Sequence, residues 1–96
     1  MRADSGILSM VQIEIYSTAV CPYCVAAKNL LKSRGLTWQE RRIDIDPAAR
    51  AAMMEKAPSA RTVPQIFING VHVGGFDQLA AAERSGRLNE LLRDLA

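Results

Sequence analysis

Apolar and polar residues alternate and then change to a helical period in the first half of the chain. Residues 11–16 alternate and are rich in β-branched side chains, which is typical of a strand, whereas apolar residues recur at helical spacing over residues 25–34. Gly35 marks the end of that helix. Residues 38–43 form a second strand candidate, polar enough to lie near a sheet edge. The first half therefore predicts a strand, a helix and an edge strand.

A helix and a hairpin are predicted next. Asp46 and Pro47 mark a helix start, with Asp46 as N-cap and Pro47 at the first helical position, and the helix should run to about Lys56. Two short strands follow at residues 65–68 and 71–73. The Asn-Gly pair between them is the strongest short hairpin signal that a sequence carries.

The C-terminal part predicts two more helices. Asp77 can cap a helix through about Arg84, and Gly86 separates it from a last helix with four leucines on one stripe: Leu88, Leu91, Leu92 and Leu95. The predicted order is β-α-β-α-β-β-α-α, an α/β fold with a small four-stranded mixed sheet flanked by helices. Strands that alternate with helices favour parallel pairing, whereas the hairpin must be antiparallel.

Length and charge restrict the possible classes of protein. A chain of 96 residues is one small domain, and a net charge of +2 with scattered basic residues argues against nucleic-acid or anionic-membrane binding. No apolar run approaches the roughly 20 residues that span a bilayer, and the first residues lack the apolar core of a secretory signal. We expect a cytoplasmic protein with a flexible N-terminal extension at residues 1–9 and one domain at residues 10–96.

The two cysteines of the chain stand three positions apart, in Cys21-Pro22-Tyr23-Cys24. The predicted strand leads into them and the predicted helix leads away, so Cys21 should lie at or just before a helix N-terminus, where backbone N–H groups favour an anion. The thiolate is the reactive form of cysteine, and this spacing lowers a thiol pKa. The alternatives are an inert buried pair or half a metal site, but with a single histidine a zinc site within one chain would need carboxylates. A redox centre is therefore predicted.

Several other side chains have plain structural interpretations. His72 is expected to be a surface or half-buried strand residue rather than a catalytic base. Met53 and Met54 are expected to fill the core, and Trp38 and Phe67 are assigned to the core or a sheet face.

Three motifs in register resemble those of dithiol glutaredoxins, most closely the small bacterial glutaredoxin 3 type. They are Cys21-Pro22-Tyr23-Cys24, Thr62-Val63-Pro64 and Gly74-Gly75-Phe76-Asp77. The resemblance covers roughly Val11 to Ala96. It implies a thioredoxin-like fold and a glutathione-dependent thiol–disulfide oxidoreductase that reduces protein disulfides and glutathione mixed disulfides.

The resemblance also implies roles for individual residues. Cys21 would be the nucleophile, Cys24 the resolving thiol, and Pro64 a cis-proline opposite the thiols. The implied glutathione-binding residues are Tyr23, Thr62, Val63, Pro64, Gly75, Phe76 and Asp77. Among them, Asp77 can pair with the free α-amine of glutathione, while N–H groups at a helix start can hold its α-carboxylate.

One position departs from the family pattern. Many relatives carry a lysine three residues before the first cysteine, and here that residue is Thr18. Another cation could replace it, with Arg41, Arg42 and Arg61 as candidates, or the thiolate could rely mainly on the helix terminus. We favour partial replacement by Arg61.

Two other functions are compatible with the cysteine motif. One is a thioredoxin-like reductant fed by a flavoprotein reductase, which the Pro-Tyr pair between the cysteines argues against. The other is a carrier in which two chains and two glutathione thiols hold a [2Fe–2S] cluster, an interpretation that proline after the first cysteine weakens. We expect no metal, a monomer, and partners that are glutathione and disulfide-containing or glutathionylated proteins.

Overall fold

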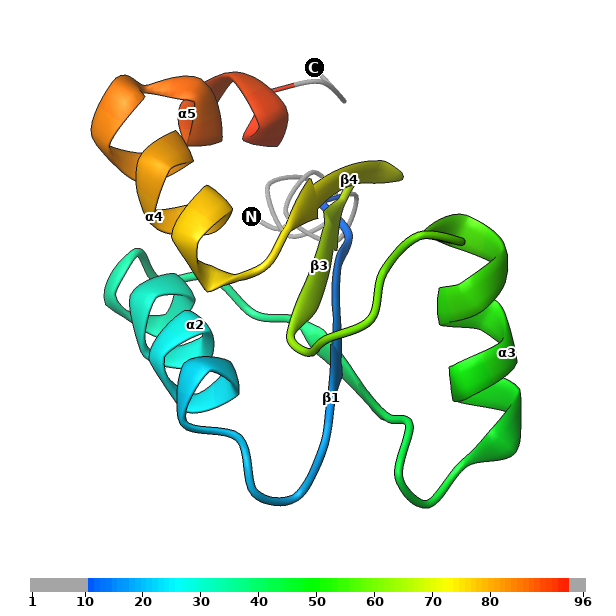
Figure 1. Ribbon diagram of the computed structural model, residues 1–96. Coiled ribbons are helices and arrows are strands. Elements are labelled where there is room, and N and C mark those ends of the chain that lie inside the picture. The colour runs from blue at the N-terminus through cyan, green and yellow to red at the C-terminus, as the bar shows by residue number, and fades with distance from the viewer. Residues whose placement is uncertain (1–10, 94–96) are drawn as a thin grey trace, which may run out of the picture.

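The computed structural model describes residues 11–93 (Figure 1), so the predicted extension at residues 1–9 lies outside the described part. The predicted order β-α-β-α-β-β-α-α is confirmed. The elements are β1 (Ile13–Ser17), α2 (Pro22–Ser33), β2 (Gln39–Arg42), α3 (Pro47–Lys56), β3 (Gln65–Ile68), β4 (Val71–Gly74), α4 (Phe76–Ser85) and α5 (Arg87–Leu92).

The four strands form one mixed sheet in the order β2-β1-β3-β4. β1 pairs parallel with β2 and antiparallel with β3, and β3 pairs antiparallel with β4 in the hairpin. The predicted edge position of β2 is confirmed. The parallel direction favoured by the alternation of strands and helices is correct for β1 and β2 but wrong for β3.

β3 runs antiparallel because the chain returns to the end of the sheet from which it left. The last residue of β2, Arg42, pairs with Ser17, and the first residue of β3, Gln65, pairs with Tyr16. α3 and the segment 57–64 therefore leave and rejoin the sheet at the same end, and β3 has to run back from there. At this same end, β1 leads into the cysteine motif.

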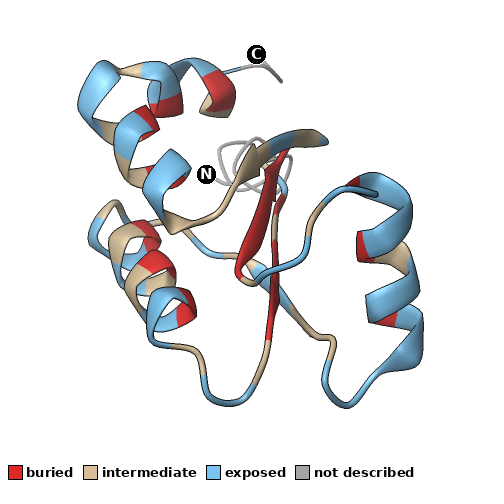
Figure 2. Ribbon diagram, viewed as in Figure 1, coloured by how far each residue is buried: buried red, intermediate tan, exposed pale blue. Residues whose placement is uncertain are grey.

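Helices cover both faces of the sheet. α3 lies on one face, and α2, α4 and α5 lie on the other (Figure 1). Alternation along β1 sends Ile13 and Ile15 to the three-helix face and Tyr16 to the α3 face, where it meets Phe67 edge-on. β3 is buried along its whole length because it lies inside the sheet with both faces covered (Figure 2).

Helix boundaries agree with the predicted caps in one case and differ in another. The Asp46 side chain accepts a hydrogen bond from the Ala48 N–H, and Pro47 begins α3, as predicted. α4 begins at Phe76 with Gly75 as its N-cap, so Asp77 lies inside the first turn and the predicted Asp77 cap is wrong. The glycine turn supplies the extended backbone before the helix, which leaves the Asp77 carboxylate free to face outward.

The predictions for core residues are correct for some side chains and wrong for one. Met53 and Phe67 are buried, and Trp38 packs against the core on the three-helix face. Met54 is 43% exposed, so its assignment to the core is wrong: it is the next residue after Met53 on α3 and therefore points about 100° away. Leu95 lies outside the described residues. Within residues 11–93, no helix has the length and apolar character needed to cross a membrane.

Candidate active site

Cys21 is the N-cap residue of α2, with extended backbone before the first helical turn. Its Sγ accepts a hydrogen bond of 3.0 Å from the Cys24 N–H, and Pro22 occupies the first helical position. The two cysteines are joined by a disulfide, with Cα atoms 5.1 Å apart. Cys21 is half-buried, whereas Cys24 is only 1% exposed. A thiolate on Cys21 would therefore meet a backbone N–H and the positive end of the α2 dipole.

The segment before β3 lies directly against the first cysteine. The Val63–Pro64 peptide bond is cis, as the resemblance implies, and the Val63 carbonyl oxygen lies 3.8 Å from Cys21 Sγ. Pro64 is buried while Val63 is partly exposed, because β3 starts at Gln65. The Val63 backbone is thus presented at the sheet end that holds the disulfide.

A pocket of about 330 Å³ opens beside this segment. It is lined by Tyr23, Thr62, Val63, Pro64, Gly75, Phe76, Asp77 and Gln78. The Tyr23 and Phe76 rings stack with centroids 6.4 Å apart, so they join the first turns of α2 and α4 at the rim. All seven residues named from the sequence for glutathione therefore meet in one pocket.

Gln78 is the pocket residue that the sequence interpretation missed. Its Oε1 accepts a hydrogen bond of 2.9 Å from the Gly75 N–H, which closes the N-terminal turn of α4. Gly74 adopts φ of +120°, a conformation that favours glycine, and a Cβ there would lie only 3.0 Å from Gln78 Cγ. The signal was available: glutamine at the third helical position after a capping residue is half of a capping box.

A second pocket of about 320 Å³ also has Val63 in its lining. Thr18, at the position of the family lysine, lines it together with Arg50, Met54 and Arg61. The Arg61 Nη1 donates to the carbonyl oxygens of Pro58 and Ala60, at 3.0 and 3.2 Å. Thr62 and Val63 line both pockets. Two arginines thus line the same pocket as Thr18.

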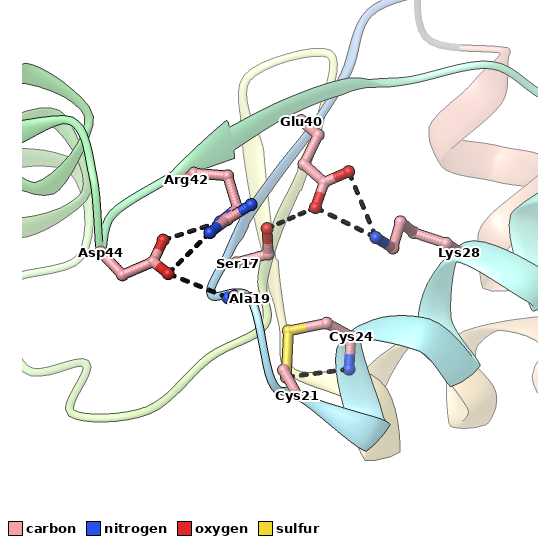
Figure 3. A network of polar contacts seen from close by, with 8 residues as sticks. All are labelled: Ser17, Ala19, Cys21, Cys24, Lys28, Glu40, Arg42 and Asp44. Carbon is pink, nitrogen blue, oxygen red and sulfur yellow. Dashed lines mark hydrogen bonds and ion pairs between the residues drawn. A yellow bond between two sulfur atoms is a disulfide. The ribbon is translucent and has the colours of Figure 1, made fainter.

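The other two arginines proposed as replacements are engaged elsewhere. The Arg41 guanidinium lies over the Tyr16 ring, 5.6 Å from its centroid. Arg42 donates two hydrogen bonds to Asp44, of 2.7 and 2.8 Å, and Asp44 also accepts the Ala19 N–H at 3.0 Å (Figure 3). These bonds, chiefly those from the guanidinium, hold the pKa of Asp44 well below its ordinary value of 3.8. The Arg42–Asp44 pair fastens the loop that leads to Cys21.

A second polar network connects β1, β2 and α2 (Figure 3). The buried Ser17 hydroxyl donates to Glu40 Oε2 at 2.6 Å, and the Lys28 ammonium donates to both carboxylate oxygens at 3.2 and 3.0 Å. The Ser17 hydrogen bond is the main reason that the pKa of Glu40 falls below its ordinary 4.5, and Lys28 adds to it against the opposing effect of burial.

His72 is outside the cysteine site. Its Nε2 lies 2.7 Å from Gln65 Oε1, and its ring stacks on Phe67. It is an exposed residue of β4, in agreement with the non-catalytic interpretation. Across residues 11–93, no three His, Cys, Asp or Glu side chains come together in a group that could hold a metal ion.

Comparison with known proteins assigns the family. Residues 13–73 match the family model named Glutaredoxin. The chain is 51% identical over 83 residues to a glutaredoxin of Pseudomonas aeruginosa, covering 86% of this chain and 98% of that protein. It is 45% identical over 84 residues to glutaredoxin 3 of Escherichia coli, covering 88% of this chain and all of that protein.

Solved structures agree with this assignment. The solution structure of glutaredoxin from Brucella melitensis superposes with a TM-score of 0.75 at 44% identity, covering 92% of this chain and 95% of that one. The crystal structure of a buckwheat glutaredoxin–glutathione complex gives a TM-score of 0.75 at 29% identity, covering 95% and 84%. The thioredoxin-like fold is therefore established for residues 11–93.

Proposed function

The chain belongs to the glutaredoxin family of glutathione-dependent disulfide oxidoreductases, and we propose that it reduces both glutathione mixed disulfides and protein disulfides through Cys21 and Cys24. The observation that supports this most directly is the pocket between the Val63–Pro64 segment and the start of α4, which opens beside Cys21. Its lining offers backbone, aromatic and carboxylate groups within reach of one thiol.

In the reaction with a mixed disulfide, the Cys21 thiolate attacks the sulfur of the glutathione moiety. The substrate thiol leaves, and Cys21 becomes glutathionylated. A second glutathione thiolate then attacks that glutathione sulfur, which forms glutathione disulfide and returns the electron pair to Cys21. The N-cap position and the Cys24 N–H favour the thiolate in both steps.

In the reaction with a protein disulfide, Cys21 attacks first and forms a mixed disulfide with the protein. Cys24 then attacks Cys21 Sγ, releases the protein thiol and leaves the Cys21–Cys24 disulfide. That disulfide is the oxidised state of the pair. Its protein partners are therefore expected to be disulfide-containing or glutathionylated proteins.

Glutathione is proposed to bind as an extended chain across Val63. The Val63 backbone pairs with the peptide, the Asp77 carboxylate binds the α-amine, and the N–H groups of Phe76 and Asp77 bind the α-carboxylate. These two residues begin α4, so their N–H groups have no partner inside the helix. The glycine end would then reach the second pocket, where Arg50 and Arg61 supply positive charge in place of the lysine absent at Thr18.

A coupled assay tests this function. Turnover of a glutathione mixed disulfide is measured with glutathione and glutathione reductase, and in parallel with thioredoxin reductase as the only electron source. We expect turnover with glutathione and little with the other system. The reverse preference would assign the chain to the thioredoxin-type reductants instead.

A further inference from the structure

Ser17, Glu40 and Lys28 bring a hydroxyl, a carboxylate and an ammonium group together beneath the first turns of α2. Ser17 is fully buried at the end of β1, while the Lys28 and Glu40 side chains are 27% and 31% exposed. Burying a hydroxyl beside a carboxylate is costly unless both are hydrogen-bonded, and here they are. None of these three residues takes part in the reactions proposed for Cys21.

The periodicity of two elements places this network at Cys24. Side chains of β1 alternate, so Ser17 follows Ile13 and Ile15 on the three-helix face of the sheet. The facing stripe of α2 contains Cys24 and Leu31, both buried. Since β1 ends and α2 begins at the same end of the sheet, Ser17 lies level with the first turns of α2 rather than with Leu31.

Lys28 is one helical turn after Cys24. Residues at this spacing are neighbours, with Cβ atoms about 5–6 Å apart. Long helical side chains also lean toward the N-terminal turn, so the stem of Lys28 leans toward Cys24. Figure 3 shows the two side chains on successive turns of α2, with Glu40 reaching Lys28 from β2.

We propose that the Ser17–Glu40–Lys28 network holds the Lys28 ammonium near Cys24. There the ammonium stabilises the negative charge that forms on the Cys24 sulfur when the Cys21–Cys24 disulfide opens. This rests on the proposed function, in which Cys24 is the resolving thiol. Lys28 is a positioning residue, because it acts through Cys24 and touches no substrate. Glu40 balances the charge of Lys28, and Ser17 fixes the carboxylate.

The chemical step shows where the charge is needed. A glutathione thiolate forms a bond to Cys21 Sγ, the Cys21–Cys24 bond breaks, and the electron pair goes to Cys24 Sγ. Cys24 then takes a proton from water and becomes a thiol, and a second glutathione completes the two-electron reduction at Cys21. A leaving thiol of lower pKa departs faster, but burial of Cys24 opposes charge on its sulfur. A nearby ammonium offsets that opposition.

The charges near Cys24 predict opposite effects for two substitutions. Lys28→Met removes the ammonium and leaves the Glu40 carboxylate, which disfavours a thiolate on Cys24. Glu40→Gln leaves the ammonium without its counter-charge, which favours that thiolate. The other charged pair of Figure 3, Arg42–Asp44, is unchanged in both variants. A network that only held the elements together would be damaged in the same direction by either change.

The experiment measures two quantities in the full-length protein. The first is the rate at which glutathione opens the Cys21–Cys24 disulfide, which is measured by acid quenching and alkylation of the free thiols. The second is the pKa of Cys24 in a Cys21→Ser background, which is measured by the ultraviolet absorbance of the thiolate as the pH is varied. Lys32→Met is the matched control, because Lys32 is an exposed lysine one turn further along α2.

We expect Lys28→Met to slow opening roughly three- to tenfold and to raise the pKa of Cys24. Glu40→Gln should lower that pKa and leave opening at least as fast as in the unsubstituted protein. Shifts of the same sign in both variants, or shifts no larger than those of Lys32→Met, would overturn the proposal. A failure of the proposed function looks different, because the unsubstituted protein would then fail in the glutathione-coupled assay while the opposite pKa shifts persisted.

Discussion

The two cysteines of one short motif stand in opposite environments. Cys21 is half-buried, caps a helix and meets backbone groups, namely the Cys24 N–H and the Val63 carbonyl. Cys24 is almost fully buried, and the Lys28–Glu40 pair that we propose as its support joins α2 to β2. The half-buried thiol of Cys21 can thus be activated by the backbone at the start of its own helix, whereas in our proposal the buried thiol of Cys24 depends on side chains that only the tertiary fold brings together.

The strongest test of this contrast replaces each cysteine with serine. Cys21→Ser should abolish turnover of a glutathione mixed disulfide, because the remaining thiol, Cys24, is only 1% exposed and cannot reach the substrate sulfur. Cys24→Ser should stay within about threefold of the unsubstituted protein in the same assay, because this reaction needs one thiol only. Both variants should fail to turn over a protein disulfide efficiently. Equal loss of mixed-disulfide turnover in the two variants would contradict the division of roles.

The environment of Cys21 could be predicted from the sequence, because short local motifs set it. A Cys-x-x-Cys motif between a strand and a helix predicts a thiol at a helix N-terminus, and the structure has Cys21 as the N-cap. The Val63–Pro64 segment and the Gly75–Asp77 turn were assigned by family resemblance, and they meet in one pocket. Short motifs carry this information because each fixes its own backbone.

The environment of Cys24 could not be predicted in the same way. Ser17, Lys28 and Glu40 lie on three elements, and nothing in their local sequence indicates that they meet. Their contact follows from the parallel register of β1 and β2, in which Ile15 pairs with Glu40. The direction of β3 was mispredicted for a related reason: the path of segment 57–64 sets it, and that path has no local pattern.

The Asp77 carboxylate lines the pocket beside Cys21. Asp77→Ala should raise the apparent KM for glutathione roughly five- to tenfold, because a charge-assisted hydrogen bond to the α-amine is lost at an exposed site. kcat should change less, since Asp77 does not touch the reacting sulfurs. Asp77→Asn keeps a hydrogen-bond acceptor but not the charge, so its KM should lie between those of the unsubstituted protein and Asp77→Ala. An unchanged KM in Asp77→Ala would remove Asp77 from the binding site.

A smaller effect is expected from the arginine beside the second pocket. Arg61→Ala should raise the KM for glutathione about two- to threefold, since Arg61 is exposed and its charge is screened by solvent. The difference from the unsubstituted protein should shrink as ionic strength rises. Arg87→Ala, at the exposed start of α5, is the matched control. A salt-independent change would mean that Arg61 acts by holding the carbonyl groups of Pro58 and Ala60 rather than by charge.

The smallest effect tests the Cys24 side through stability alone. The pKa of Glu40 in the folded protein lies below its ordinary value of 4.5, so its ionised form stabilises the fold at neutral pH. This contribution is present above the unfolded-state pKa and is lost as pH falls through the lower folded-state pKa. Glu40→Gln cannot titrate, so it should be less stable than the unsubstituted protein by about 0.5–1 kcal/mol at neutral pH, with the difference narrowing below pH 4.5. Denaturant unfolding of the oxidised proteins across this pH range measures it, with Glu55→Gln, an exposed glutamate of α3, as the control. A stability difference that stays constant with pH would show that Glu40 contributes by packing rather than by charge. It would then count against an electrostatic role of the Lys28–Glu40 pair beside Cys24.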